Sequence, residues 1–184
     1  MAINAAVKGD SFERYIEEIR SIWGDGKDPQ LPFKVKDLMA NLFSSTTSGE
    51  PWMAQLIREG KPSRELYRDP DFGFIQMGHV HAKGHGNAPH DHGPCWVVYG
   101  SYTGLTEITL YRRTDDGKVP GRGTLEKKEL HRLGPGVVYP YLADDIHSTH
   151  AVETPAVVFR FLSYDLLKVE RHRYNLDKGT ISVV

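Results

Sequence analysis

The sequence of 184 residues contains a single cysteine, Cys95, which excludes an internal disulfide. It has no apolar run long enough to span a bilayer, and its first residues lack the apolar core of a signal peptide. Neither sign of charge is in excess: 23 basic and 24 acidic residues leave a formal net charge of −1, so nothing attracts the chain to nucleic acid or to an anionic membrane surface. These absences predict a cytoplasmic protein that binds neither nucleic acid nor a membrane.

The composition is that of an ordinary soluble globular protein, with 39% hydrophobic and 26% charged residues. A chain of this length can bury a full core, but it is too short to divide comfortably into two domains. We therefore predict a single domain over residues 1–184, with a helical region at residues 1–65 followed by a β region at residues 66–184.

Three amphipathic segments support the helical region. Apolar side chains recur at helical spacing from Phe12 to Trp23, and residues 10–13 have the spacing of a capping box, with Asp10 as the N-cap. Two more apolar stripes run through residues 33–43 and 52–58. We expect these stripes to pack on the β region rather than to form a ligand groove.

Short β segments dominate the rest of the chain. Residues 72–83 alternate as a strand, and Gly104 marks a turn between two of the later segments. The further segments predicted to be strands are Trp96–Gly100, Thr106–Tyr111, Val137–Pro140 and Ala156–Phe161.

Two histidines, His90 and His92, stand at positions i and i+2. On an extended strand such side chains point to the same side, so both rings can reach one point in space. Asp91 between them faces away and could orient one ring from behind. Imidazole suits iron, nickel, copper and zinc, so the pair predicts part of a divalent metal site, which His147 could complete. The alternative is a histidine-rich surface turn.

A second pair, His79 and His81, has the same spacing. The loop at residues 82–89 separates the two pairs, so four histidines could line adjacent strands of one cavity. We interpret His79 and His81 as walls of a pocket beside the metal site. A second metal site is the alternative.

This pattern resembles the cupin superfamily. Its members carry an H-x-H pair a few residues before a glycine turn, and then a Gly-Pro stretch that leads to a third histidine. Here the pair is His90 and His92, and residues 134–136 lead to His147; the match covers roughly residues 72–172. The resemblance implies a mainly β fold, a single jelly-roll-type cupin barrel with an N-terminal helical region, and a metal held by His90, His92 and His147.

Within the superfamily, residues 84–93 resemble the thiol dioxygenases that act on cysteine and mercaptopropionate. These enzymes have a similar glycine-rich approach to His-Asp-His, and they lack the glutamate that many cupins place four or five residues after H-x-H. Trp96 and Val97 occupy those positions here, and residues 145–147 and 155–157 resemble the branch's third-ligand motif and the segment after it. The resemblance implies a neutral three-histidine site for Fe(II), with zinc or nickel possible in its place.

The resemblance also implies a chemistry. In the resembled enzymes a thiolate binds the iron, and both atoms of dioxygen end on the sulfur as a sulfinate. The protein holds the ligands, orients the substrate and excludes water. The expected partners are therefore a small anionic substrate and O₂.

The chain departs from this branch in its substrate-binding residues. The Ser-x-His-x-Tyr triad of the branch falls on Val158, Arg160 and Leu162, so the tyrosine of the thioether crosslink is absent. Cys95 lies two residues before the crosslinking position. The resembled enzymes bind the substrate carboxylate with an arginine before the His-Asp-His strand, and Arg68 is its counterpart by position.

Arg160 is a second candidate for binding an anion, because its alternate neighbours on the predicted strand are apolar. If that face lines the interior, a buried guanidinium needs an anion; if it faces outward, Arg160 is an ordinary surface charge. We predict a small carboxylate-bearing ligand held by Arg68 and Arg160, with His79 and His81 lining the wall beside it.

Two classes of function follow from this pattern. The first is a non-heme iron(II) dioxygenase that oxidises a small thiol-bearing carboxylic acid to its sulfinate with O₂. The alternative is a metal-binding cupin of non-redox type, either a small-molecule sensor or a zinc- or nickel-dependent hydrolase or isomerase. The pocket has no obvious catalytic carboxylate, which favours redox chemistry at the metal. Residues 168–184 are expected to add a strand or to serve a homodimer.

Overall fold

The computed structural model describes residues 10–184, and the side chain of Asp10, on which the predicted capping box depends, lies outside that description. Three helices come first: α1 (Asp10–Trp23), α2 (Leu31–Ser45) and α3 (Pro51–Glu59). Prolines stand in the first turns of α2 and α3, where a missing N–H costs no helical hydrogen bond. Gly60 ends α3 in the left-handed conformation, with φ 58°.

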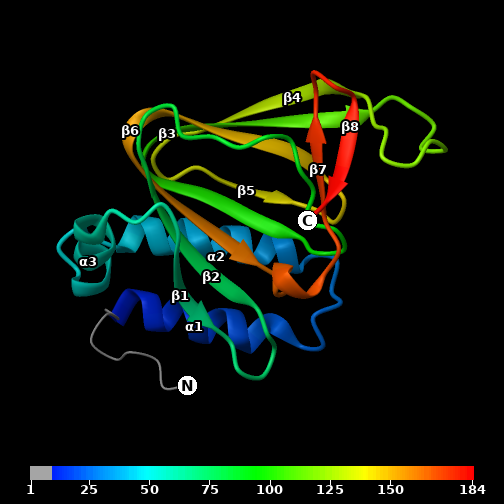
Figure 1. Cartoon of the computed structure of the whole chain (residues 1–184). Helices are drawn as coiled ribbons and strands as arrows, with labels where there is room; N and C mark the ends of the chain where they lie inside the picture. Colours follow the sequence, from blue (N-terminus) through cyan, green and yellow to red (C-terminus); the bar gives the residue numbers. More distant parts are fainter. Residues whose placement is uncertain (1–9) are drawn as a thin grey trace.

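Antiparallel strands form most of the remaining chain, which confirms the predicted mainly β fold with an N-terminal helical region (Figure 1). β1 begins at Arg64, so Arg64 and Glu65 belong to the sheet rather than to the helical region. The strands are β1 (Arg64–Arg68), β2 (Ile75–His81), β3 (Val97–Arg113), β4 (Leu125–Leu133), β5 (Val138–Tyr141), β6 (Ile146–Leu162), β7 (His172–Asn175) and β8 (Thr180–Val183).

Two strands of 17 residues, β3 and β6, pair from Val97 to Tyr111 of β3 and connect the two layers of the fold. The sequence predicted two separate strands joined by a turn at Gly104, and this was wrong. The pairing continues through three register shifts between Ser101 and Thr106, because bulges bend a strand without ending it. Gly104 has φ 74°, and a Cβ there would stand 2.5 Å from the carbonyl oxygen of Glu153.

The bend divides the sheet into two layers. The first layer contains β1, β2, β5, the first half of β3 and the second half of β6. The second layer contains β4, the second half of β3 and the first half of β6. Apolar side chains of both layers form one buried cluster between them, which we call the inner core: Ile75, Cys95, Val97, Tyr99, Ile108, Leu110, Leu133, Tyr141, Ala151, Ala156, Val158, Leu162 and Leu166.

The helices cover the opposite face of the first layer (Figure 1). Side chains alternate across a pleat, so Phe159 and Phe161 of β6 point to the helices while Val158 and Leu162 point to the inner core. Trp23 of α1 contacts Phe161, with ring centroids 5.9 Å apart. The helical stripes therefore pack on the sheet as expected. None of the helices in residues 10–184 is both long and apolar enough to cross a membrane.

Strands β7 and β8 form a hairpin that lies beside the segment carrying His90 and His92. The N–H of Asp91 donates to the carbonyl of His172 at 3.1 Å, and the N–H of Tyr174 donates to the carbonyl of Pro89 at 2.8 Å. The hairpin thus adds a strand next to the candidate ligands. This is one of the two arrangements expected for residues 168–184.

Candidate metal centre

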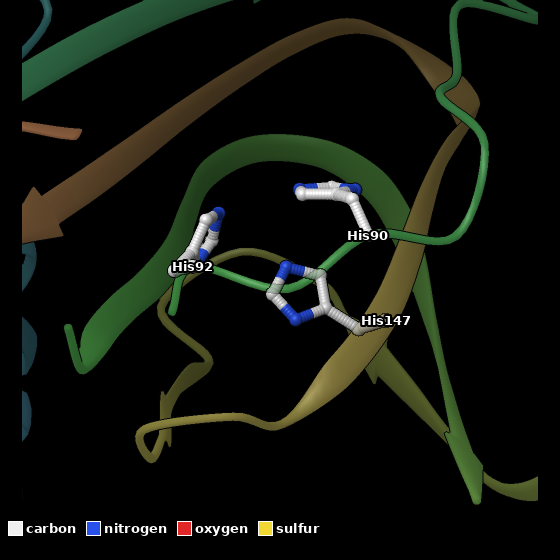
Figure 2. A group of neighbouring side chains, drawn as sticks. All are labelled: His90, His92 and His147. Carbon is white, nitrogen blue, oxygen red and sulfur yellow. The ribbon is translucent and has the colours of Figure 1, made fainter. Parts of the chain in front are cut away.

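His90, His92 and His147 form a compact group (Figure 2). Each can present one ring nitrogen such that the three nitrogens lie within 4.8 Å of one another. The ring centroids are 5.0 Å apart for His90 and His92, 4.8 Å for His90 and His147, and 4.9 Å for His92 and His147. The figure shows the three rings converging on one point. The three rings could therefore hold a single metal ion.

Backbone pairing brings these distant residues together. The N–H of each of His90 and His147 donates to the carbonyl of the other, both at 2.9 Å. This antiparallel bridge places the two residues opposite one another at the start of β6, and His92 follows two residues after His90 on the same side. The spacing of His90 and His92 places their rings on one side of the chain, and the backbone pairing of His90 with His147 brings the third ring to the same place.

The group has the protonation state that a metal requires. Burial, followed by the positive charge of neighbouring groups, holds the pKa of His92 and of His147 well below the usual histidine value, and the pKa of His90 is also lowered. The Nδ1 of His90 lies 3.0 Å from the carbonyl oxygen of Ala88, which can only accept. Nδ1 must therefore carry the proton, and Nε2 of His90 is left with a lone pair.

Ring nitrogens of the other two histidines lack hydrogen-bond partners among residues 10–184. Nε2 of His92 and Nε2 of His147 are buried with no hydrogen-bond partner in the described chain. A buried polar atom without a partner is costly, and a metal ion would satisfy both lone pairs at once. The group found among residues 10–184 consists of histidines alone. It could therefore hold a metal ion through three neutral donors, a set that suits iron, zinc or nickel.

Asp91 has a different role from the one expected. Its carboxylate accepts hydrogen bonds from Nδ1 of His172 at 3.0 Å, from the hydroxyl of Tyr174 at 3.2 Å and from the backbone N–H of Gly93 at 3.1 Å. Asp91 does face away from the ligand side, but these contacts attach the C-terminal hairpin instead of orienting a ligand ring. Burial and the Asp91 carboxylate together raise the pKa of Tyr174 to about 12.

Arg160 faces the inner core beside the three histidines. It lies opposite Tyr99 on β3 and Met77 on β2, and Nη1 donates to the Tyr99 hydroxyl at 3.4 Å. Its Nε is buried without a hydrogen-bond partner in the described chain. Its charge also lowers the pKa of His90, His92 and His147. Arg160 is therefore an inward-facing cation next to the candidate centre.

His79 and His81 lie on the same inner face, opposite Val158 and Ala156 of β6. Burial, then the charge of Arg160, lowers the pKa of His79 to about 3; burial and His85 lower that of His81 to about 4. Both rings are therefore neutral at pH 7. The Nδ1 of His79 lies 2.9 Å from the carbonyl of Pro62, so Nδ1 donates and its buried Nε2 is an acceptor without a partner in the described chain.

Arg68 is the predicted site residue that has partners elsewhere. Its Nη1 contacts the carboxylate of Asp165 at 2.7 Å, and its Nη2 contacts Glu65 at 2.7 Å. The charges that lower the pKa values of the three clustered histidines include Arg160 but not Arg68. Arg68 already binds two carboxylates, so its contacts do not support the predicted role of binding a substrate carboxylate.

Sequence reasoning missed two residues of this region, Tyr99 and Arg171. The Tyr99 ring stacks on His92 at 6.4 Å and meets His147 edge-on at 5.5 Å, besides its contact with Arg160. Its spacing of two residues from Val97 in the predicted strand could have placed it on the inner face. Arg171 contributes to the lowered pKa of His90 and His92. Nothing local signals it, because its position depends on the pairing of the hairpin with residues 89–93.

Comparisons with known proteins found similar folds but no sequence family. No family model matches the chain, and no curated protein matches it. Among solved structures, KdgF from Halomonas sp. is similar over 54% of this chain and 76% of its own, with 19% identity and a TM-score of 0.41. A cupin superfamily protein from Desulfitobacterium hafniense is similar over 56% and 76%, with 16% identity and a TM-score of 0.41. The cupin domain of Schizosaccharomyces pombe Cnp3 is similar over 58% and 66%, with 12% identity and a TM-score of 0.43.

Proposed function

We propose that this protein is a cupin-type, non-heme iron(II) dioxygenase that oxidises a small thiol-bearing carboxylic acid to its sulfinate with O₂. The observation that carries the proposal is the group of the partly buried His90 and the buried His92 and His147, which in residues 10–184 includes no carboxylate. Three neutral ligands leave the full charge of a divalent ion for an anionic substrate. Bound Fe(II) would supply the activation of dioxygen and the oxidation of sulfur.

The surrounding residues support binding of an acid. Arg160 offers a fixed positive charge on the inner face, and the Tyr99 hydroxyl that accepts from it restricts its orientation. A guanidinium binds a carboxylate through two parallel hydrogen bonds, so it fixes the direction of a small acid as well as its position. His79 and His81 remain neutral and add hydrogen-bonding groups without adding charge. The inner core behind them excludes water from this side.

The test combines metal content with oxygen consumption. The full chain is loaded anaerobically with Fe(II), Zn(II) or Ni(II), and O₂ uptake is measured with 3-mercaptopropionate, cysteine and cysteamine. We expect one equivalent of iron, O₂ consumption with the two acids and a sulfinate product by NMR. His92→Ala should lose most bound metal and all turnover, because two histidines bind a divalent ion much more weakly than three.

The matched control is His150→Ala. His150 lies on β6 three residues after His147, but its side chain is exposed. The control should keep both metal and activity. Stoichiometric zinc or nickel binding without O₂ uptake on any thiol would overturn the proposal in favour of a non-redox cupin, either a sensor or a hydrolase or isomerase. Full metal occupancy in His92→Ala would refute the ligand set.

A further inference from the structure

A second inward-facing arginine comes from the C-terminal hairpin. His90 and Arg173 lie directly opposite one another in an antiparallel bridge. Continuing that register by two residues in each direction places Arg171 opposite His92. Residues directly opposite one another in an antiparallel pair project to the same face. Arg171 therefore projects to the side on which His90 and His92 point.

The hydrogen bonds on the other face establish the register independently. Asp91 stands between the two histidines and points away from them. Its carboxylate bonds the side chains of His172 and Tyr174, which alternate with Arg171 and Arg173. Because even-numbered residues of the hairpin share the face of Asp91, Arg171 must share the face of the candidate metal ligands.

Arg160 and Arg171 are alike in lacking a counter-charge. The Nε atom of each is buried without a hydrogen-bond partner in residues 10–184, and neither guanidinium takes part in any ion pair found in that part of the chain. By contrast, Arg68 is neutralised by two carboxylates. Two uncompensated guanidinium groups beside a site for a divalent cation are unfavourable unless an anion binds there.

The two arginines come from opposite layers of the fold. Arg160 lies in the second half of β6, within the layer that the helices cover. Arg171 lies beside the ligand segment, which pairs with the first half of β6 in the other layer. A ligand with two anionic groups, one at each end of a short molecule, can therefore contact both Arg160 and Arg171 better than a ligand with a single anionic centre.

We infer that the site takes a small dicarboxylate, with one carboxylate on Arg160 and the other on Arg171. The inference deepens the proposed function, on which it rests for the third group of the ligand, the thiol at the metal. A mercaptodicarboxylic acid such as mercaptosuccinate then meets all three demands. The two anion subsites belong to the protein itself, so their occupancy requires neither iron nor turnover.

The test uses a matched pair of probes without a thiol. Binding of succinate and of butyrate to the full chain is measured by calorimetry, as purified and after chelation of metals. We expect succinate to bind about tenfold more tightly than butyrate or better, because it makes a second charge-assisted contact. Arg171→Met should abolish that preference and leave butyrate binding unchanged. Arg160→Met should weaken both acids.

The control is Arg112→Met, since Arg112 is exposed on β3 and paired with Glu126. It should keep the preference for succinate. Arg171→Lys keeps the positive charge but loses the two parallel N–H donors of the guanidinium, so it should retain part of the preference for succinate. If Arg171→Met folds poorly, this variant distinguishes loss of the charge from loss of structure. Equal affinities in the parent protein, or an unchanged preference in Arg171→Met, would overturn the inference. Tighter binding of inorganic phosphate than of succinate would also overturn it, since one anionic centre would then suffice.

These outcomes are distinguishable from failure of the proposed function. A protein that consumes no O₂ with any thiol but prefers succinate through Arg171 keeps the dicarboxylate site and loses only the dioxygenase. A protein that oxidises 3-mercaptopropionate and mercaptosuccinate with equal KM keeps the dioxygenase and loses the second anion subsite. The KM for mercaptosuccinate should otherwise be the lower of the two, and the advantage should disappear in Arg171→Met.

Discussion

On one face of strand β6, Phe159 and Phe161 are fully buried among aromatic side chains of the helices and the neighbouring strands. On the other face, Arg160 stands between Val158 and Leu162 with a buried Nε that has no partner in the described chain. The two faces differ by one step along the backbone. One face is filled by apolar packing, whereas the other carries a charge and lies beside buried ring nitrogens that have no hydrogen-bond partner in residues 10–184.

The comparison shows that alternate residues of β6 serve different purposes: those facing the helices stabilise the fold, and those facing the inner core are available for binding. The helices pack on the face of the first layer opposite the inner core, and this packing stabilises a fold whose inner face carries unpartnered polar groups. Sites commonly depend on such support, because unpartnered buried polar groups reduce the stability of the fold that holds them. Substitutions on the two faces should therefore change stability and binding in opposite ways.

The largest expected effect is on the helix-covered face. Phe159→Ala should lower the free energy of unfolding by about 3–5 kcal/mol, because Phe159 is fully buried against Phe43 and Trp52 and its removal leaves a cavity. Urea denaturation measures the change. The folded fraction should still bind one equivalent of metal. A loss of metal stoichiometry in protein that is demonstrably folded would contradict the separation of the two faces.

A smaller effect should appear with pH on the inner face. The pKa of His79 is about 3 in the folded protein and near its ordinary 6.5 when unfolded. Between these values the unfolded chain binds a proton that the folded chain does not, so the free energy of unfolding falls as the pH decreases below about 6.5. The contribution is about 1.4 kcal/mol for each pH unit. It is absent above pH 6.5, where both states are neutral.

The variant His79→Gln isolates this contribution. Glutamine does not titrate. Below pH 6.5 the slope of the unfolding free energy against pH should therefore decrease by about 1.4 kcal/mol per pH unit relative to the parent, which corresponds to one proton. His150→Gln, which changes an exposed histidine of β6, should leave the slope unchanged. Equal slopes for the parent and His79→Gln would show that His79 titrates normally in the folded protein.

The third effect has the opposite sign from an ordinary core substitution. In the presence of a chelator, His147→Leu should raise the free energy of unfolding by about 1–2 kcal/mol, because it removes a fully buried ring whose Nε2 has no partner in the described chain. The same variant should bind no metal. Thermal unfolding with and without added metal measures both. A destabilised variant under chelating conditions would show that His147 is satisfied within the chain.

The smallest expected effect on stability is that of Tyr99→Phe. The ring that contacts His92 and His147 stays, and only the hydroxyl that accepts from Arg160 is lost, so stability should change by less than about 1 kcal/mol. Butyrate should bind about three- to fivefold more weakly, since Arg160 is no longer oriented. Tyr111 lies on β3 like Tyr99, and its hydroxyl is hydrogen-bonded to Ser148 of β6; Tyr111→Phe should leave butyrate binding unchanged. Unchanged binding in both variants would remove Tyr99 from the orientation of Arg160.

The sequence was most informative where function and local geometry coincide. The spacing of His90 and His92 requires only strand alternation, and the structure brings His147 to the same place. The helical stripes needed only periodicity. The single long strand through Gly104 was not predictable, because a glycine with φ above zero fits a bulged bend as well as a turn. The bend became visible only from its pairing with β6.

Electrostatic partners were the least predictable part of the site. Arg68 and Arg160 were both predicted to bind the substrate carboxylate, yet Arg68 pairs with Asp165, a residue 97 positions away, and Arg160 meets no carboxylate in the described chain. The orientation of Arg160 depended on whether the even- or the odd-numbered residues of its strand face the inner core. Arg171 could not be identified at all, since its role depends on a hairpin that pairs with residues far earlier in the chain.

The pairing of β7 with residues 89–93 has a consequence for protein synthesis. A nascent chain that has emerged only as far as residue 170 contains all three candidate ligands, but it lacks His172 and Tyr174, the groups that bond Asp91. Its ligand segment would have neighbours on one side only, through the bridge to His147. Metal acquisition should therefore be a late event, which follows translation of β7 rather than translation of the last histidine of the triad. Stalled chains ending before and after β7 would differ sharply in the metal they retain.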